Sequence, residues 1–262
     1  MRRWLMAATM CVAACGRISF DPLAATRDGA IAIDDSSGGG LDTTASIDAG
    51  LPAGLVGWYP FEAAATSDDV IANHDGMCGL NLCPQPAAGH IGGGVQFDGI
   101  DDCFTVSDAG QLQLPQITLA IWANQATGGT LSHVSKRVVG GSVNSWQLET
   151  EALGMPANSL SFTTYDNSGF NQYARTAANT IVLGTWQHLA ATYDGTTKRV
   201  YINGIEQASV AEPTALPYDN MPMMIGCDDN NPISEYYNGT LDDLQIYNRA
   251  LSATEIADLA AR

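Results

Sequence analysis

The chain has 262 residues, of which 45% are hydrophobic and 15% charged, and its 28 acidic and 11 basic residues give a formal net charge of -17. The hydrophobic fraction suffices for a sizeable core, and all-β units of about 200 to 250 residues commonly form one domain. The acidity argues against nucleic acid as a partner, because neutralising phosphates takes clustered Lys and Arg, and against loose binding to anionic lipid. The sequence contains no run of about 20 apolar residues, so it predicts no membrane-spanning helix.

The beginning of the chain predicts an export signal. Arg2 and Arg3 form a short basic region, and residues 4–14 form an apolar stretch of small residues that is too short to span a membrane. The stretch ends in Val12-Ala13-Ala14-Cys15, which resembles the signal of bacterial lipoproteins. This resemblance implies that residues 1–14 are removed and that Cys15 becomes a lipidated N-terminus. An ordinary secretory signal that happens to contain a cysteine is the alternative.

The neighbours of this cysteine refine the prediction. Cys11 is a poorer match, because the Met10 that precedes it is not small. Gly16 follows Cys15 where Asp would resemble an inner-membrane retention signal, so we expect the outer membrane, with contact to the membrane through the lipid alone. Residues 16–52 carry six Asp and no Trp or Tyr. Such a segment cannot bury enough apolar surface to offset its ordering entropy, so we expect residues 15–52 to form a disordered acidic tether.

From residue 53 onward the pattern changes to short alternating runs separated by Gly, Asn and Asp, which predicts one all-β domain over 53–262. Asn203-Gly204 between two such runs is a strong hairpin signal. Ser252 followed by Glu255 forms a capping box before a short C-terminal helix. The expected strands are 55–61, 94–97, 103–106, 117–123, 146–150, 160–165, 187–193, 199–202, 223–226 and 240–247. Together they predict an antiparallel two-sheet sandwich.

Four ordered blocks of this domain resemble a known family. They are 57–62 (Gly-Trp-Tyr-Pro-Phe-Glu), 94–102 (Gly-Val-Gln-Phe-Asp-Gly-Ile-Asp-Asp), 186–204 (beginning Trp-Gln-His-Leu-Ala-Ala-Thr-Tyr-Asp-Gly and ending Tyr-Ile-Asn-Gly) and 238–252 (Asn-Gly-Thr-Leu-Asp-Asp-Leu-Gln-Ile-Tyr-Asn-Arg-Ala-Leu-Ser). They are similar to the laminin-G-like branch of the concanavalin A-like jelly rolls. The resemblance implies two antiparallel sheets, one of them concave, with the first and last strands paired.

The domain holds four cysteines, Cys78, Cys83, Cys103 and Cys227, and three pairings are open. Cys78 and Cys83 are close enough to clip a local loop, which leaves Cys103 for Cys227. The alternative is a Cys₄ metal site, which the absence of a C-x-x-C pair disfavours. We expect two disulfides.

Catalysis is not expected. Retaining glycosidases need two carboxylates about 5 Å apart, and hydrolases of this fold carry them on one strand as Glu-x-Asp-x-x-Glu. The nearest pattern here is Glu149-Thr150-Glu151, which lacks the Asp and the third carboxylate. We interpret the pair as part of a solvated outer face. The sequence therefore favours a binding module, with a glycoside hydrolase-like enzyme as the least favoured alternative.

Two clusters of aromatic and amide residues are candidates for ligand binding, because aromatic faces and polar groups together recognise sugars. The candidate residues are Tyr165, Asn167, Phe170, Asn171 and Tyr173 in the first cluster and Tyr236 in the second. We expect carbohydrate as the ligand. A cell-surface protein remains the alternative, since laminin-G-like domains also bind proteins.

A structural Ca²⁺ site is a further expectation. Relatives of the concanavalin A-like type often bind the ion near the first and last strands through an Asp that resembles Asp242. Calcium takes about six to eight oxygen ligands, and Asp75 in the turn 73–76 is the second candidate, ahead of Glu62. The alternative is that both Asp side chains accept only backbone hydrogen bonds. Asp98, Asp101 and Asp102 are expected to form a bulge and a turn.

Overall fold

The computed structural model describes residues 50–62, 67–80, 82–138, 144–151, 156–165, 171–229 and 232–262. Every described residue belongs to one compact unit, residues 48–262. The predicted signal peptide, Cys15 and nearly all of the predicted tether lie outside the described residues. In the part of the chain that is described, no helix has the length and apolarity needed to cross a membrane.

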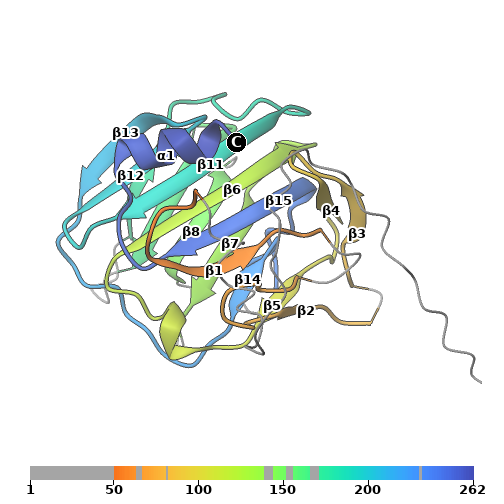
Figure 1. Cartoon of the computed structure of the whole chain (residues 1–262). Coiled ribbons are helices and arrows are strands. Elements are labelled where there is room, and N and C mark those ends of the chain that lie inside the picture. The colour runs from red at the N-terminus through yellow and green to blue at the C-terminus, as the bar shows by residue number, and fades with distance from the viewer. Residues whose placement is uncertain are drawn as a thin grey trace, which may run out of the picture. The chain divides into compact units, whose positions relative to one another are not determined.

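The described unit contains two antiparallel sheets (Figure 1). The eight-stranded sheet runs in the order β13 (Ile205–Ala211), β12 (Thr197–Ile202), β11 (Trp186–Tyr193), β6 (Ile117–Gln125), β15 (Asn238–Tyr247), β4 (Gly93–Asp98) and β3 (Gln85–Ala88), and β1 (Leu55–Tyr59) also pairs with β15. The seven-stranded sheet runs in the order β10 (Asn171–Arg175), β9 (Ser159–Tyr165), β8 (Asn144–Glu151), β7 (Leu131–Arg137), β14 (Met223–Ile225), β5 (Phe104–Val106) and β2 (Gly76–Met77). A 3₁₀ turn (Gly110–Leu112) follows β5. The predicted all-β sandwich is confirmed, as is the pairing of the first strand with the last.

The core lies between the two sheets, because alternate residues of each strand point inward. Trp146 and Leu148 of β8, Phe162 of β9 and Ile121 of β6 belong to one buried cluster. The predicted hairpin is present between β12 and β13, where Asn203 and Gly204 both have positive φ angles. Two positive φ angles match the type I′ turn, whose twist suits paired strands.

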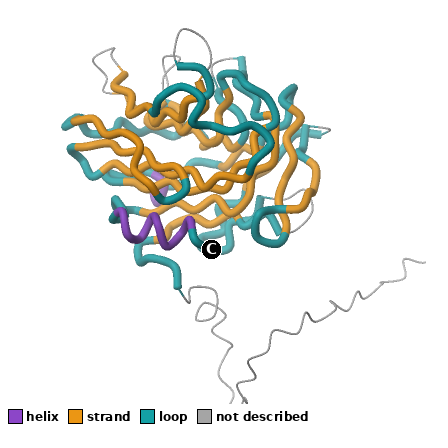
Figure 2. The backbone as a smooth tube through the Cα atoms, turned by 90° about the horizontal axis from the view of Figure 1, so that it is seen from above, coloured by secondary structure: helices purple, strands orange, loops and turns teal. Residues whose placement is uncertain are grey.

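Helix α1 (Ala253–Ala260) begins with the predicted capping box, in which Ser252 and Glu255 exchange hydrogen bonds. Ile256 and Leu259 pack on Tyr201 and Tyr247, on the face of the eight-stranded sheet that points away from the core. Figure 2 shows the helix on the outside of the strands. The cysteines form two disulfides, Cys78–Cys83 and Cys103–Cys227, and the second joins the region of β5 to the residues after β14.

Each of the ten expected strands coincides with an observed strand, but the sequence pattern missed others. Neither strand β7 nor strand β10 was among the expected strands. In β7 the outward positions are polar and the inward-lying Lys136 interrupts the apolar pattern, with its Nζ 2.7 Å from Asp108 Oδ1. Residues 171–175 pair with β9 in full register, so Asn171 and Tyr173 are strand residues.

Candidate functional site

The outward face of the seven-stranded sheet carries polar side chains across four neighbouring strands. Residues opposite each other in an antiparallel pair lie on the same face of a sheet. One row therefore runs from Tyr173 through Thr163 and Gln147 to Ser135. The adjacent row runs from Arg175 through Ser161 and Glu149 to Ser132.

These side chains are linked by hydrogen bonds. Glu149 Oε1 accepts a hydrogen bond from Thr163 Oγ1 at 2.8 Å. Gln147 Nε2 donates to Glu235 Oε2 at 2.7 Å, and the backbone N–H of Ser132 donates to the carbonyl of Glu235. The segment that contains Glu235 therefore lies against β7 and β8.

A salt bridge extends the same surface to the edge of the sheet. Arg175 Nη2 lies 2.6 Å from Glu151 Oε1, and the guanidinium carbon is 4.5 Å from the centre of the Tyr173 ring. We call this surface the polar face and define it by its members. They are Ser132, Ser135, Asn144, Gln147, Glu149, Glu151, Ser161, Thr163, Tyr173, Arg175, Asp228 and Glu235.

The interpretation of Glu149 and Glu151 as a solvated pair is wrong. Both lie on one face, as the alternation indicates, but Glu149 is only 6% exposed and Glu151 is 7% exposed. Strand periodicity tells which side chains share a face. It does not tell whether that face is exposed or, as here beside the segment with Glu235, buried.

Burial and crowding of acids set the electrostatics of the polar face. Burial raises the pKa of Glu149 well above its ordinary value, and the nearby carboxylates of Glu151 and Glu235 raise it further. Burial also raises the pKa of Asp228. A carboxyl group that keeps its proton can donate a hydrogen bond as well as accept one.

Within the described residues, several buried polar atoms of the same surface have no hydrogen-bond partner. They are Asp228 Oδ1, Asn144 Oδ1, Ser132 Oγ and Arg175 Nε. A buried polar group without a partner costs about 1 to 3 kcal/mol. A polar ligand with several donors and acceptors would satisfy such atoms, so the polar face is the candidate binding site.

The structure brings part of the predicted aromatic cluster to this site. Tyr173 lies on the polar face, and Tyr165 lies half-buried at the end of β9. Tyr236 packs instead against the Cys103–Cys227 disulfide. Asn167 and Phe170 lie outside the described residues, as does the side chain of Asn171.

The sequence analysis missed Gln147, Thr163, Arg175 and Glu235 as site residues. The alternation of apolar and polar residues in 144–151 and 159–165 places the first two on one outward face and could have indicated them. Glu235 has no such signal, because it reaches the site from a loop.

A second group of side chains lies on the outward face of the eight-stranded sheet. His90 stacks on Trp122 with ring centres 3.5 Å apart, and His188 packs edge-on against the same tryptophan. Burial lowers the pKa of His188 to about 4, so this ring is neutral at pH 7. With 3% of its surface exposed, His188 is a neutral, buried side chain of this group.

Asp242 and Asp75 accept hydrogen bonds from different backbone segments. Asp242 lies on the outward face of the eight-stranded sheet, where its Oδ2 accepts a hydrogen bond from the backbone N–H of Ile91. Asp75 accepts one from the backbone N–H of Asp69, beside the carbonyl of residue 74 that binds the hydroxyl of the core residue Tyr59. The two carboxylates are thus each engaged by a backbone N–H group of a different segment, and binding of Ca²⁺ stays a prediction.

The acidic turn after β4 forms as the sequence predicts. The carboxylates of Asp98, Asp101 and Asp102 lie within 4.8 Å of one another. Asp98 Oδ1 accepts from the N–H of Ile100, and Asp102 Oδ2 accepts from the N–H of Asp98. The carboxylates of Asp98 and Asp102 therefore stabilise the turn by accepting backbone hydrogen bonds within it.

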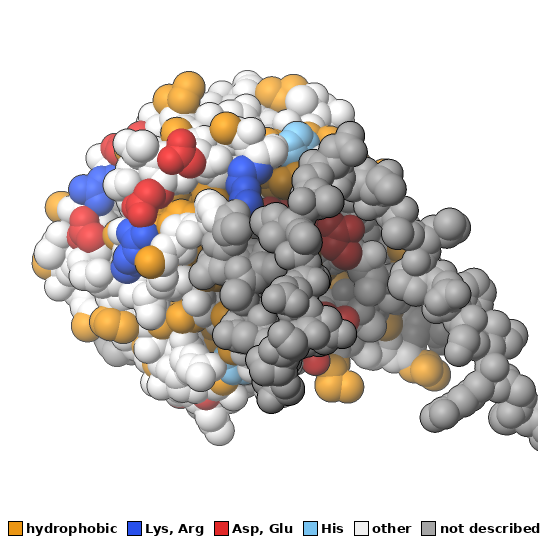
Figure 3. Space-filling view, viewed as in Figure 1, with side chains coloured by type: hydrophobic (Ala, Val, Ile, Leu, Met, Phe, Trp, Pro, Cys, Tyr) orange, Lys and Arg blue, Asp and Glu red, His pale blue; other side chains and the backbone are white. Residues whose placement is uncertain are grey.

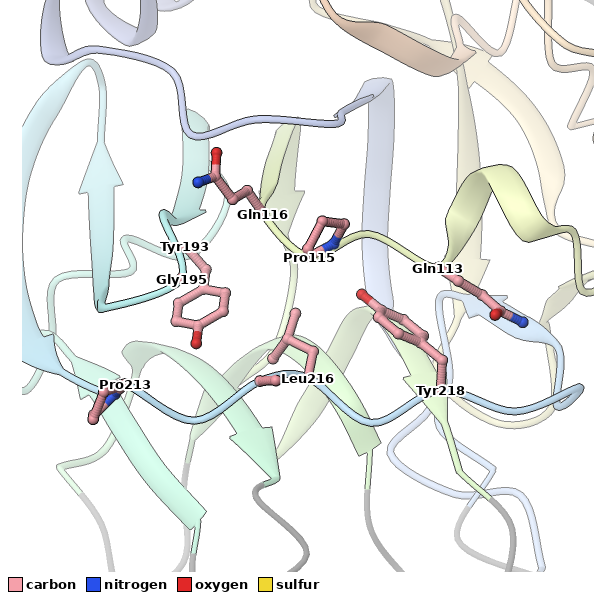
Figure 4. Close-up of a pocket in the computed structure, with 9 residues that line it drawn as sticks. Gln113, Pro115, Gln116, Tyr193, Gly195, Pro213, Leu216 and Tyr218 are labelled. Atoms are coloured by element: carbon pink, nitrogen blue, oxygen red, sulfur yellow. The ribbon is translucent and has the colours of Figure 1, made fainter.

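A cavity of about 470 Å³ opens between the segments 113–116 and 213–218 (Figure 4). Its polar groups are already engaged: the hydroxyl of Tyr193 donates to the carbonyl of Thr214, and that of Tyr218 donates to the carbonyl of Leu114. What remains is mainly aromatic and apolar surface. The cavity contains none of the predicted site residues.

Two antiparallel sheets around one core, with a polar face turned outward, define a jelly-roll domain of the lectin kind. A laminin G family model, described as the concanavalin A-like lectin/glucanases superfamily, matches residues 98–257, and the chain belongs to this family. A search of curated proteins gave no match.

Solved structures share the fold. Domain 4 of AbnA, an extracellular GH43 arabinanase of Geobacillus stearothermophilus in complex with arabinotriose, is 23% identical over 79% of this chain and 98% of that one, with a TM-score of 0.61. The binding domain of Paraclostridial Mosquitocidal Protein 1 is 18% identical over 79% of this chain and 52% of that one, with a TM-score of 0.63. The sialidase of Trypanosoma rangeli is 18% identical over 80% of this chain and 33% of that one, with a TM-score of 0.55. The chain thus spans about half and a third of the last two.

Proposed function

We propose that residues 53–262 form a non-catalytic carbohydrate-binding module whose ligand lies on the polar face. The observation that carries this proposal is the set of buried polar atoms there without partners, among them Asp228 Oδ1 and Asn144 Oδ1. Sugar hydroxyls both donate and accept hydrogen bonds, so a saccharide would satisfy these atoms together. Tyr173 adds an aromatic side chain at one end of the row.

The comparisons support a saccharide as the ligand class. The arabinanase domain with the same fold was solved in complex with arabinotriose. Because that domain is only 23% identical to this chain, it supports the class of ligand and not the particular sugar.

We also propose that this module is exported and held at the bacterial cell envelope by lipid on Cys15, with residues 16–52 as the spacer. The sequence Val12-Ala13-Ala14-Cys15 supports lipidation, and Gly16 supports the outer membrane. A lipid anchor and a spacer would present the module to saccharides near the cell.

The test is a glycan array probed with residues 16–262. Gln147→Leu keeps the size of the side chain and removes the amide that binds Glu235, and Tyr165→Ala removes an aromatic side chain beside the site. We expect both variants to weaken saccharide binding by about tenfold or more. Ile205→Ser, at an exposed position of the other sheet, is the matched control and should bind as the wild type does.

Two results would contradict the proposal. Silence of the wild type on the array, with a protein partner recovered by crosslinking, would favour an adhesion module. Hydrolysis of a β-glucan that Glu149→Gln abolishes would make the domain an enzyme.

A further inference from the structure

The charges of the polar face and its immediate border are predominantly acidic. The carboxyl groups are those of Glu149, Glu151, Asp228, Asp229 and Glu235, and the basic groups are those of Arg137 and Arg175. Both guanidinium groups are engaged by acids: Arg175 by Glu151 at 2.6 Å, and Arg137 by Asp229 at 2.9 Å. Among the described residues, an anionic sugar would therefore meet carboxyl groups and no guanidinium group that an acid does not already engage.

Two of the buried oxygen atoms without partners, one on Asp228 and one on Asn144, can accept hydrogen bonds from a ligand. Asp228 is 1% exposed and Asn144 is 7% exposed, and the Oδ1 atom of each has no hydrogen-bond partner among the residues that the structure describes. The Asp228 carboxylate lies close enough to Glu149 to raise its pKa. A ligand group with several N–H donors and a positive charge would donate hydrogen bonds to these acceptors and would also be attracted by the nearby acidic groups.

A single bound metal ion does not fit this distribution. Among the described residues, the only set of three His, Cys, Asp or Glu ligand atoms within 4.8 Å of one another is in the turn 98–102. The acids of the polar face are thus spread over a wider surface than one coordination sphere. A chain molecule with repeated cationic groups matches this spread better.

We infer that the saccharide bound on the polar face carries free amino groups, as in β-1,4-linked glucosamine oligomers. This inference rests on the proposed function and names its ligand class. An ammonium group donates three hydrogen bonds and carries one positive charge, whereas the corresponding N-acetyl group or hydroxyl is neutral. Charge-assisted hydrogen bonds are about twice as strong as neutral ones, so the difference is measurable.

The test compares three hexasaccharides with the same β-1,4 backbone: glucosamine, N-acetylglucosamine and glucose oligomers. Titration calorimetry at about pH 5.5 and low salt should give a dissociation constant for the glucosamine oligomer at least about tenfold lower than for the other two. The advantage should shrink with added salt, which screens charge. A cation near Glu149 favours its ionised form, so binding should also release protons, seen as a dependence of the heat on the buffer.

Glu235→Gln keeps the shape of a side chain on the polar face and removes its charge, so it should reduce the preference for glucosamine. Glu206→Gln makes the same change of net charge on the exposed edge strand β13 of the other sheet and should leave the preference intact.

Equal or tighter binding of either neutral oligomer would overturn the inference and leave the proposed function standing. So would a preference that Glu235→Gln does not alter. If no saccharide of any class binds, on the array or in solution, the proposed function fails and the inference fails with it.

Discussion

Asp242 is a carboxyl group placed where ionisation is unfavourable. It lies in β15 opposite Trp122, between the core residues Leu241 and Leu244, and it is fully buried. Its Oδ2 accepts from the N–H of Ile91, but its Oδ1 has no partner in the described part of the chain. Burial, and then the charges of Asp243 and Glu62, raise its pKa to about 7.

This raised pKa predicts a dependence of stability on pH. In the unfolded chain Asp242 ionises near pH 4, while in the folded chain it keeps its proton up to about pH 7. Between these values the unfolded state holds fewer protons, so this group lowers the free energy of unfolding as the pH rises. Asp242→Asn removes the titration, so the melting temperature of the variant minus that of the wild type should increase by about 3 °C or more from pH 4 to pH 8.

The difference in melting temperature between Asp242→Asn and the wild type removes the contribution of groups that titrate in both proteins. Burial lowers the pKa of His133 and of His188 to about 4, and these side chains make the opposite contribution as the pH falls. A difference in melting temperature that stays constant from pH 4 to pH 8 would contradict the assignment of the raised pKa to Asp242.

Short strands at one end of the seven-stranded sheet depend on covalent links. β14 and β5 have three residues each and β2 has two, so they contribute few ladder hydrogen bonds. The Cys103–Cys227 disulfide joins residues 124 positions apart and ties the start of β5 to the end of β14. The Cys78–Cys83 disulfide closes a loop with a separation of only 5.

The two disulfides should therefore contribute unequally to stability. In the loop-entropy description, replacing Cys103 and Cys227 with Ala lowers the free energy of unfolding by about 5 kcal/mol, and replacing Cys78 and Cys83 by about 2 kcal/mol. Guanidinium unfolding of the two double variants measures both values. A larger loss from the Cys78 and Cys83 pair would show that the length of the closed loop does not govern this domain.

At the level of elements, the sequence predicted the strands that show alternation and the hairpin that has a characteristic turn sequence. The strands around Trp146 and Phe162 follow the apolar period, and the hairpin follows from Asn203-Gly204. The residues of the site follow such rules only in part. Alternation placed Glu149 on one face with Glu151, but Glu235, which binds the neighbouring Gln147 and raises the pKa of Glu149, comes from a distant loop, and no local pattern encodes that contact.

The same limit applies to the calcium prediction, which stays a prediction. Asp242 was expected to need a partner because it interrupts an apolar strand, and the structure does place it in a buried environment. The backbone of the turn at Ile91 supplies that partner. A sequence motif cannot distinguish a backbone N–H from a cation as the group that satisfies a carboxylate.

On the scale of the whole molecule, opposite faces of the sandwich have different roles. Helix α1 covers part of the eight-stranded sheet through Ile256 and Leu259, so that area serves packing. On this side of the molecule, the described surface of Figure 3 has Lys and Arg side chains close to Asp and Glu and no extended basic area. The net charge of -17 is therefore not offset there by a basic patch that could bind phosphates.

The anchor proposed at Cys15 predicts how the full chain partitions. When the complete sequence is expressed in a Gram-negative bacterium, the wild type should incorporate labelled palmitate and enter the detergent phase in a Triton X-114 separation. Cys15→Ser removes the thiolate that accepts the lipid, so the variant should incorporate no label and remain in the aqueous phase. Because two or more acyl chains make attachment stable whereas a chain without lipid stays in solution, the shift from the detergent phase to the aqueous phase should be nearly complete.

Cys11→Ser, four residues earlier in the same apolar stretch, is the matched control and should partition as the wild type does. Palmitate on the Cys15→Ser protein, or its loss from Cys11→Ser, would contradict lipidation at Cys15.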